Sequence, residues 1–289
     1  MNILLTGASG FIGRHIANAL AARGHQVRSV SRRDGFDFRD LQDSADWLPL
    51  LDGVDTVINS VGIIGESGRQ TFATLHTAAP IALFRACERA GVRRVLQISA
   101  LGADHTAFSA YHLSKRAADD CLRGLDLDWF VLRPSLIYGR GGKSAELFMK
   151  LAALPMIPVI GDGQQKLQPV HISDVVVTAL FCLDAPAARQ TLDIVGDETV
   201  SFAEWLQCMR SAQGKPRARL LHVPLALALS ASRLGRYLNP ILQPENLRML
   251  QTGYRADGRA LRQFLGRPPR PFDPALFFRD VDLLAGSSS

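Results

Sequence analysis

The sequence of 289 residues is poor in cysteine, and its cysteines have no spacing that marks a site. All four fall far apart, in segments that we expect to be helical: Cys87, Cys121, Cys182 and Cys208. Structural zinc sites and disulfide frameworks both need cysteines in close, repeated spacing. The sequence therefore predicts no metal site and no disulfide scaffold.

Long apolar runs are also lacking. The longest, residues 220–229, is about half the roughly 20 residues that a membrane-spanning helix needs, and Pro224 interrupts it. The chain enters Ile3-Leu4-Leu5 without a basic leader, which is typical of a first strand. We therefore expect a cytoplasmic protein with no transmembrane segment. Residues 220–238 are interpreted as a helix of a small domain, with a lid or a peripheral helix at a membrane surface as alternatives.

Basic residues outnumber acidic ones but do not cluster. The chain has 33 Lys and Arg against 27 Asp and Glu, a net charge of +6. Nucleic-acid-binding proteins usually gather their cations on one helix or face. The scatter predicts no nucleic-acid partner, and the 47% of apolar residues is typical of a folded globular protein.

Short apolar runs alternate with segments of helical period from Asn2 to about Arg133. The expected strands are residues 2–6, 26–31, 56–60, 94–99 and 129–133. The expected helices are residues 10–23, 72–90 and 109–124. This order of strand-helix units predicts an α/β fold with a doubly wound parallel sheet.

The pattern changes after Arg133, where eight glycines and prolines fall between residues 134 and 163. Such density indicates irregular loops. A helix over 172–183 and a strand over 191–195 then return to the sheet, and residues 201–284 are mainly helical. We predict that residues 1–134 and about 172–196 form the sheet domain. Residues 135–171 and 197–285 form a smaller, mostly helical domain, and residues 286–289 a frayed tail.

A glycine-rich turn, Thr6-Gly7-Ala8-Ser9-Gly10-Phe11-Ile12-Gly13, joins the first strand to the first helix. A dinucleotide-binding (Rossmann) fold needs glycine here for a tight turn, for approach to a pyrophosphate and for helix-strand packing. Free amides at the helix start then hold the phosphates. The sheet domain is therefore predicted to bind a dinucleotide, and the alternative is a turn that merely uses glycine. The expected contacts are Gly7, Ser9, Gly10, Phe11, Ile12 and Gly13.

The end of the second strand discriminates between NAD and NADP. NAD sites place an acidic residue there, whereas the fork of arginine suits a 2′-phosphate. The strand ends Ser31-Arg32-Arg33, with Asp34 one position late, so NADP is favoured and NAD stays the alternative. Asp37 and Phe38 are expected to flank the adenine. Ser60-Val61-Gly62, after the third strand, would let backbone approach the adenine ribose.

Four motifs together resemble the short-chain dehydrogenase/reductase superfamily, in its extended or atypical epimerase/dehydratase-like branch. They are the glycine turn, Tyr111-x-x-x-Lys115, Leu132-Arg133-Pro134-Ser135-x-x-Tyr138-Gly139 and Gln168-Pro169-Val170-His171-Ile172-x-Asp174-Val175. The run Ile98-Ser99-Ala100-Leu101-Gly102-Ala103-Asp104 is similar to the subgroup that contains the dehydrogenase-like accessory subunit of respiratory complex I, as is Phe264-Leu265-Gly266. The resemblance implies a doubly wound sheet with a small C-terminal substrate domain.

The resemblance also implies catalytic roles. Tyr111 resembles the acid/base, and Lys115, one helical turn later, would lie on the same face. Its ammonium and the charge of the nicotinamide would lower the pKa of Tyr111 and stabilise the phenolate. In relatives Pro134, Ser135 and Ile137 would border the nicotinamide end of the cofactor.

Two positions depart from the family pattern. A serine or threonine just beyond the strand 94–99 usually orients the substrate oxygen, but Ala100 and Leu101 stand there. Ser99 is then the expected third catalytic group, with Thr106 and Ser109 as alternatives. His76 stands where the family commonly has an asparagine.

The preferred function is an NADP-dependent oxidoreductase that acts on a carbonyl or hydroxyl of an unidentified small molecule. The alternative is a catalytically silent protein that keeps NADP(H) as a structural element or redox sensor and acts through a partner, such as a respiratory complex. Asp174, at the start of a helix, is interpreted as a cap rather than a catalytic group, and His171 as structural. Homo-oligomers and peripheral contact with a membrane stay open.

Overall fold

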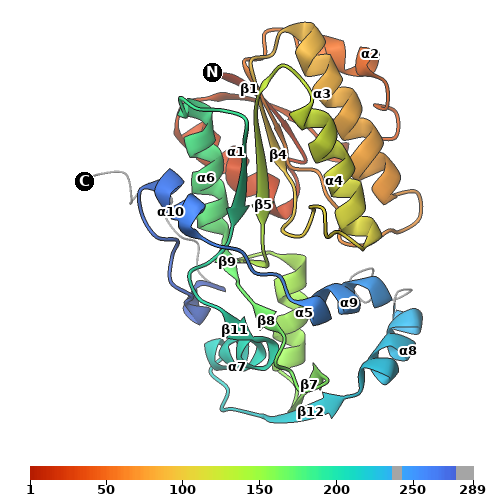
Figure 1. Ribbon diagram of the computed structural model, residues 1–289, viewed down its shortest axis with the longest axis vertical. Helices are drawn as coiled ribbons and strands as arrows, with labels where there is room; N and C mark the ends of the chain where they lie inside the picture. The colour runs from red at the N-terminus through yellow and green to blue at the C-terminus, as the bar shows by residue number, and fades with distance from the viewer. Residues whose placement is uncertain (236–242, 278–289) are drawn as a thin grey trace. The chain divides into compact units, whose positions relative to one another are not determined.

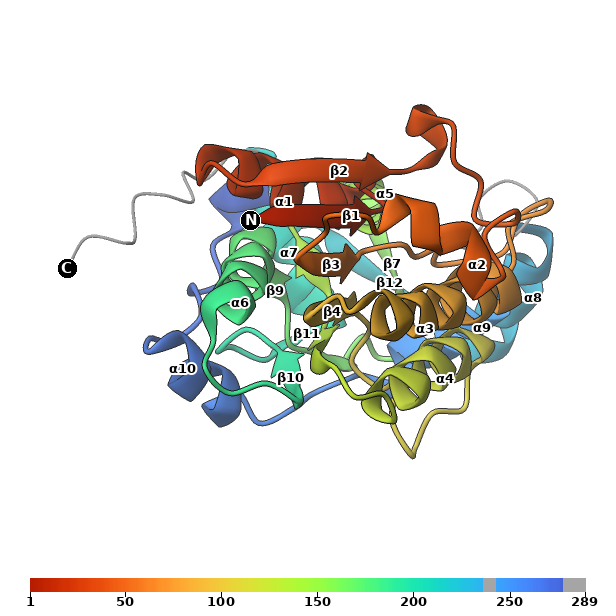
Figure 2. The same ribbon diagram turned by 90° about the horizontal axis from the view of Figure 1, so that it is seen from above.

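The short apolar runs in the first half of the chain form one six-stranded sheet, in the order β10-β5-β4-β3-β1-β2. The structure, a computed structural model, describes residues 1–235 and 243–277. The strands are β1 (Asn2–Thr6), β2 (Gln26–Val30), β3 (Thr56–Asn59), β4 (Arg94–Ile98), β5 (Asp128–Pro134) and β10 (Gln190–Ile194). Neighbours from β2 to β5 pair in parallel, and Figure 2 shows β2, β1, β3 and β4 side by side. All six strands lie within one residue of their expected bounds, so the predicted doubly wound sheet is confirmed.

Helices cover both faces of this sheet (Figure 1). α1 (Phe11–Ala22) and α6 (Ile172–Asp184) lie on one face, and α3 (Ala79–Ala90) and α4 (Ala110–Arg123) lie on the other. A π-helical segment, η3 (Ala73–Ala78), runs directly into α3. The short helices are η1 (Arg32–Asp34), α2 (Ser44–Trp47) and η2 (Leu48–Leu50). Apolar side chains of β1, β3, β4 and β5 are buried on α3 and α4, including Leu4, Val57, Val95 and Val131.

The strand order places the glycine turn at the point where the winding of the sheet reverses. β1 has β2 on one side and β3 on the other, and the chain visits them in opposite directions from the centre. In open parallel sheets, ligands bind at the carboxyl ends of the strands at such a switch point. The segments that follow β1, β3 and β4 therefore share one edge of the sheet.

The chain packs as two compact units. Unit 1 comprises Met1–Pro134 and Val175–Asp193, and unit 2 comprises Ser135–Asp174 and the chain from Ile194 onward. Unit 2 has five helices among the described residues: α5 (Lys143–Ala152), α7 (Phe202–Ala212), α8 (Leu225–Gly235), α9 (Pro244–Thr252) and α10 (Arg259–Leu265). It also has the 3-10 turn η5 (Pro274–Phe277). Its core gathers the rings of Tyr138, Trp205, Phe272 and Phe277.

Three two-stranded sheets accompany these helices. They are β6 (Ile137–Tyr138) with β9 (Val170–His171), β7 (Met156–Ile160) with β12 (Arg219–Val223), and β8 (Lys166–Leu167) with β11 (Val200–Ser201). The helix expected over 220–238 is therefore wrong in its first part, because β12 pairs with β7 and α8 begins only after Pro224. Residues 236–238 of that segment, the end of the predicted C-terminal domain and the tail at 286–289 lie outside the described residues.

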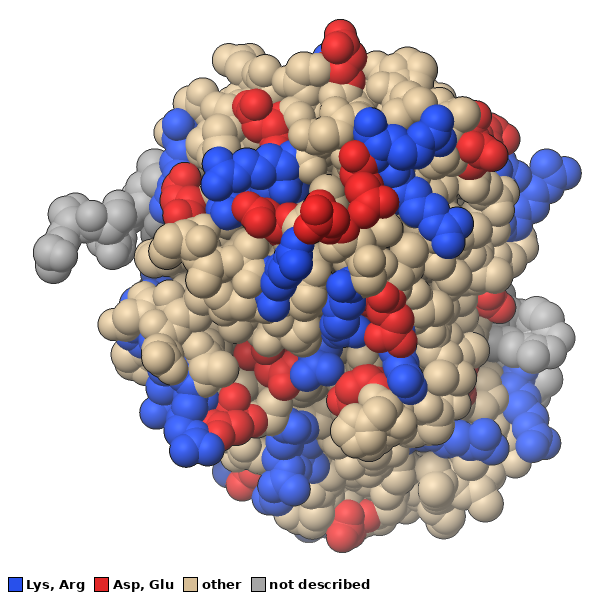
Figure 3. All heavy atoms as spheres, turned by 45° about the horizontal axis from the view of Figure 1, so that its top comes forward, with Lys and Arg blue, Asp and Glu red and all other residues tan. Residues whose placement is uncertain are grey.

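Charged side chains are mixed at the surface. On the face that Figure 3 shows, basic and acidic side chains are interspersed rather than gathered by sign. Within the described residues, no helix is both long and apolar enough to cross a membrane.

Candidate active site

The glycine turn after β1 is closely packed. Gly7 has a φ of +71°, which favours glycine, and its carbonyl accepts a 2.9 Å hydrogen bond from the Gly10 N–H. A Cβ on Gly13 would lie 2.2 Å from the Gly7 carbonyl oxygen. α1 therefore begins against the backbone of the turn, and no side chain of its N-cap residue caps its first amides. Amides in this position bind phosphate groups. The same turn contains the other predicted contacts, Ser9, Phe11 and Ile12.

The end of β2 brings two arginines and a carboxylate together. Arg32 and Arg33 are exposed, and neither guanidinium forms a hydrogen bond or ion pair with the described part of the chain. The Asp34 carboxylate accepts hydrogen bonds from the hydroxyls of Ser31 (2.6 Å) and Ser29 (2.7 Å), which lower its pKa. The spacing alone placed Asp34 too late to reach this position, but the 3-10 turn η1 folds it back to the strand. Groups that suit a 2′-phosphate and a group that suits a ribose hydroxyl are therefore both present.

Asp37 and Phe38, the two residues expected to flank an adenine, differ in their surroundings. Asp37 accepts a 2.9 Å hydrogen bond from Nε of Arg39, and this contact lowers the pKa of Asp37 to about 2. The Phe38 side chain is only 4% exposed, and its ring packs edge-on against Trp47 at 5.4 Å between centroids. Phe38 therefore belongs to the core, which differs from the role that the sequence suggested.

The loop after β3 contacts both the glycine turn and α4. The Ser60 hydroxyl donates to the Thr6 carbonyl at 2.6 Å, and a Cβ on Gly7 would lie 3.0 Å from the Ser60 carbonyl. The Val61 carbonyl accepts a 2.9 Å hydrogen bond from Nζ of Lys115. A Cβ on Gly62 would lie 3.2 Å from the same Nζ. The predicted run Ser60-Val61-Gly62 thus connects the glycine turn with Lys115.

α4 carries Tyr111 and Lys115. Lys115 is 3% exposed, and its Nζ also donates to the Ile98 carbonyl at 3.0 Å. Burial lowers the pKa of Lys115 to about 8. The Tyr111 hydroxyl forms no hydrogen bond with the described residues; burial first, and the charge of Asp119 second, raise its pKa to about 12. The lowered pKa expected for Tyr111 is therefore not a property of the chain alone, in which burial dominates.

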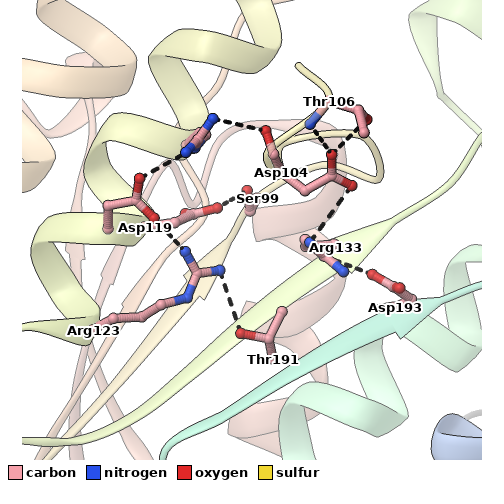
Figure 4. A network of polar contacts seen from close by, with 10 residues as sticks. Ser99, Asp104, Thr106, Asp119, Arg123, Arg133, Thr191 and Asp193 are labelled. Carbon is pink, nitrogen blue, oxygen red and sulfur yellow. Dashed lines mark hydrogen bonds and ion pairs between the residues drawn. The ribbon is translucent and has the colours of Figure 1, made fainter.

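Ser99, the expected third catalytic group, is hydrogen-bonded to another side chain of unit 1. It is 4% exposed, and its hydroxyl donates to Oδ2 of Asp119 (Figure 4). The two alternatives are also engaged, because Thr106 donates to the Asp104 carboxylate and Ser109 caps the start of α4. Asp119 was not among the residues predicted from the sequence. Its signal was the spacing, since it follows Lys115 by four residues and so lies on the same helical face.

His76 joins the loop after β3 to α4. It is completely buried in η3, and its Nε2 accepts a 3.0 Å hydrogen bond from the Ile63 N–H. The proton must therefore be on Nδ1, which lies 3.0 Å from the Ser114 hydroxyl, and Ser114 donates in turn to the Tyr111 carbonyl. Burial, with the charge of Lys115, lowers the pKa of His76 well below its usual value. A neutral histidine therefore connects the loop after β3 to the helix of Tyr111.

The three residues predicted beside the nicotinamide divide between the two units. The Pro134 carbonyl, in unit 1, accepts a 2.9 Å hydrogen bond from the Leu101 N–H. In unit 2, the Ser135 hydroxyl donates to the Gln168 carbonyl at 2.5 Å, and Ile137 begins β6. Their role beside a cofactor stays a prediction.

Asp174 is a buried carboxylate with strong partners. It accepts hydrogen bonds from Nη2 of Arg267 at 2.8 Å and from the Arg270 N–H at 2.9 Å. Nearby, Nδ1 of His171 lies 2.7 Å from the Ser173 hydroxyl. Asp174 was expected to cap a helix, but these contacts show its carboxylate, in the first turn of α6, bound to Arg267 and to the Arg270 backbone. The contact of His171 fits its expected structural role. Within residues 1–235 and 243–277, no three potential metal ligands lie together.

Comparison with known proteins gives a family and a fold. The model of the NAD dependent epimerase/dehydratase family matches residues 3–195. A ceramide reductase of Caulobacter vibrioides is 30% identical over 245 residues, which cover 80% of this chain and 76% of the relative. A mitochondrial NADH dehydrogenase (ubiquinone) 1 alpha subcomplex subunit 9 of Arabidopsis thaliana is 26% identical over 310 residues, covering 96% and 73%.

Among solved structures, the UDP-glucuronic acid 4-epimerase of Bacillus cereus in complex with UDP-glucuronic acid and NAD superimposes with a TM-score of 0.73. The identity is 17%, and the alignment covers 96% of both chains. This likeness shows the fold.

Proposed function

The chain belongs to the NAD dependent epimerase/dehydratase family, and from this membership we propose that it is an oxidoreductase. It would transfer a hydride between a nicotinamide cofactor and a carbonyl or hydroxyl carbon of its substrate. One observation carries the proposal: the loop after β3 binds the glycine-turn strand through Ser60 and the amine of Lys115 through Val61. The predicted diphosphate site and the predicted acid/base helix are therefore held by the same short loop.

The residues present fit a nicotinamide dinucleotide. A side chain on Gly10 or Gly13 would crowd the backbone of Gly7, and one on Gly7 would crowd the backbone of the loop after β3. No side chain of the N-cap residue caps the first amides of α1. These amides would hold the diphosphate. When bound, the nicotinamide supplies or accepts the hydride.

NADP is the proposed form of the cofactor, with NAD as the alternative. Arg32 and Arg33 support NADP because both guanidinium groups are exposed at the end of β2 and suit a 2′-phosphate. Asp34, held by Ser29 and Ser31, is the feature that favours NAD.

Tyr111 would move the proton. With a pKa of about 12 the phenol is protonated at neutral pH, so it is ready to donate to the oxygen of a carbonyl that is being reduced. Lys115 would favour the phenolate that this donation leaves, because a nearby cation stabilises an anion. The ring of Tyr111 is held edge-on by Phe72 at 5.8 Å and by His76 at 5.4 Å.

We propose an apolar carbonyl compound as substrate. The relative named ceramide reductase supports this choice over a charged nucleotide sugar. Phe108, just before α4, is an exposed apolar side chain at 49%.

The test begins with the nucleotide that copurifies with the protein, identified by mass and absorbance. Fluorescence titration with NADPH and NADH then gives the two affinities, and we expect NADPH to bind about 10-fold more tightly. Oxidation of NADPH in the presence of a long-chain ketone is the expected reaction. Failure of both nucleotides to bind would refute the whole proposal, whereas binding without any turnover would refute only the proposed enzymatic activity.

A second candidate function is a silent NADP(H)-binding protein that acts through a partner. The hydroxyl of Ser99 is already bound to Asp119, and Ala100 and Leu101 offer no hydroxyl in its place. The similarity to a complex I subunit also supports this candidate. Tyr111→Phe decides between the two: a silent protein keeps both its bound NADPH and its cellular role after this change, whereas an enzyme keeps only the nucleotide.

A further inference from the structure

α4 carries four ionisable residues at intervals of four: Tyr111, Lys115, Asp119 and Arg123. Residues four apart lie on the same helical face, with Cβ atoms about 5–6 Å apart. Lys115 is 3% exposed and Asp119 is fully buried. The side chains of Lys115 and Asp119 are therefore both buried on the face of α4 that carries the predicted proton donor, Tyr111.

The Asp119 carboxyl is only partly satisfied. Its Oδ2 accepts the hydrogen bond of the Ser99 hydroxyl, whereas its Oδ1 is buried with no hydrogen-bond partner among the described residues. Nε2 of Gln97, in β4, has no well-formed hydrogen bond in the described chain, but its interaction with the carboxyl helps to lower the pKa of Asp119. Arg123, one turn further along α4, adds a favourable charge. No backbone amide or ion pair within 4 Å fixes this carboxylate among the described residues, so after the hydrogen bond from Ser99 the field of Lys115 contributes most to the stabilisation of its charge.

The buried Lys115 ammonium has no anionic hydrogen-bond partner. Its Nζ donates to two carbonyls, those of Val61 and Ile98, which are neutral. The other ionisable group that faces it, His76 of η3, is neutral and therefore supplies no counter-charge. A buried ammonium among neutral acceptors loses its proton readily unless an anion lies near. Asp119 is the anion that α4 provides.

We propose that Asp119 is a positioning residue for this site, the buried counter-ion that keeps Lys115 charged and the acceptor that turns the Ser99 hydroxyl away from a substrate. This inference rests on the proposed function insofar as Lys115 assists a bound cofactor and Tyr111. It assigns Ser99 to the support of Asp119, so the residue expected as the third catalytic group is not free for a substrate.

The protonation equilibria agree with this geometry. Burial raises the pKa of Asp119 to about 6, while the hydrogen bond from Ser99 and the charge of Lys115 oppose the rise. Burial lowers the pKa of Lys115 to about 8, and Asp119 opposes that fall. Removing the Asp119 charge therefore lowers the pKa of Lys115, and it lowers that of Tyr111 as well because Asp119 helps to raise it.

The lysines make a direct test practical, because the chain has only five: Lys115, Lys143, Lys150, Lys166 and Lys215. Isotope-labelled lysines are titrated by NMR in the full chain between pH 6 and 11, and Lys115→Met assigns the signal. We expect the Lys115 midpoint near pH 8 to fall by about one unit in Asp119→Asn. Asp120→Asn, a change at the next residue, whose side chain is 55% exposed, is the matched control and leaves the midpoint in place. An unchanged midpoint in Asp119→Asn would overturn the proposal.

Ser99→Ala gives a second measurement if Asp119→Asn does not fold. Without the hydroxyl donor, the aspartate signal that titrates near pH 6 moves upward in a carboxyl-labelled sample, because the charged form has lost a hydrogen bond. A signal that stays in place shows that Asp119 does not depend on Ser99, which also overturns the proposal.

The pH profile of NADPH oxidation adds a readout that a merely structural role would not move. In Asp119→Asn the alkaline limb shifts to lower pH by the same amount as the Lys115 midpoint, and in Asp120→Asn it does not. If no variant and no wild-type sample turns over, the proposed function fails, but the lysine titration still decides the role of Asp119.

Discussion

Two buried carboxylates, one in each unit, are stabilised in opposite ways. Asp174 in unit 2 is met by the Arg267 guanidinium and by the Arg270 N–H. Asp119 in unit 1 has one hydroxyl partner and an oxygen with no hydrogen bond within the described chain. Complete partnering fixes a charge and a chain segment, whereas partial partnering leaves a group whose charge responds to its neighbours. The difference separates a carboxylate that holds the fold from one that adjusts a site.

The largest effect is expected from removing the predicted proton donor of unit 1 while keeping its fold. Tyr111→Phe deletes the proton donor but keeps the ring that packs on Phe72 and His76. We expect NADPH-dependent turnover to fall about 100-fold to 10,000-fold, with nucleotide affinity and thermal stability nearly unchanged. Steady-state kinetics and a nucleotide titration check it, and turnover within threefold of wild type would remove Tyr111 from the reaction.

The structural role of Asp174 is tested by changing its ionic partner, Arg267. Arg267→Met leaves the Asp174 carboxylate buried without its ionic partner, which we expect to cost about 3 kcal/mol of unfolding free energy. Urea unfolding measures the loss, and unit 1 should still bind its nucleotide in the native range. Arg262→Met is the control, because Arg262 pairs with Asp197 at a more exposed position. Equal losses in both variants would break the comparison.

The raised pKa of Asp119 predicts that its effect on stability depends on pH. Asp119 has a pKa of about 6 in the folded state, above its ordinary 3.8, so the folded state binds the proton more tightly. The resulting penalty is absent below about pH 4 and fully present above about pH 6. Asp119→Asn should therefore raise stability, relative to wild type, by up to about 3 kcal/mol at pH 7 and hardly at all at pH 4. Thermal melts across this range check it, and a gain that does not grow with pH contradicts the raised pKa.

The smallest effect is expected at Arg32 and Arg33, the exposed arginines of η1 beside a third carboxylate, Asp34. Arg32→Ala and Arg33→Ala should each weaken NADPH binding about threefold to 10-fold, since exposed charges are screened by water and salt. NADH binding should stay the same. Titrations at low and high salt test this, and equal loss for both nucleotides would show that the arginines do not recognise a 2′-phosphate.

The sheet of unit 1 was predictable because parallel strands are buried on both faces and so appear as short apolar runs. β12 was not, since it belongs to a two-stranded sheet, and only parts of Arg219–Val223 are covered. Pro224 marked a break but not the type of element on either side. A short apolar run has no periodicity that separates a strand from a helix.

The site was predictable where backbone geometry dictates residue type. The glycine turn is the best example, because Gly7 needs a positive φ and Gly13 has no room for a Cβ. The partners of Ser99 and Asp34 were not predictable. Both depend on contacts set by folding, a helix laid against β4 in one case and a 3-10 turn in the other.

The π-helical turn of η3 sets the direction of two aromatic side chains. A π-helical turn holds about one more residue than the α-helical turn that follows it in α3. One extra residue turns the side chains before it by about 100° relative to those after it. Deleting one residue from 73–78 should therefore rotate the ring of Phe72 away from Tyr111 while α3 stays packed.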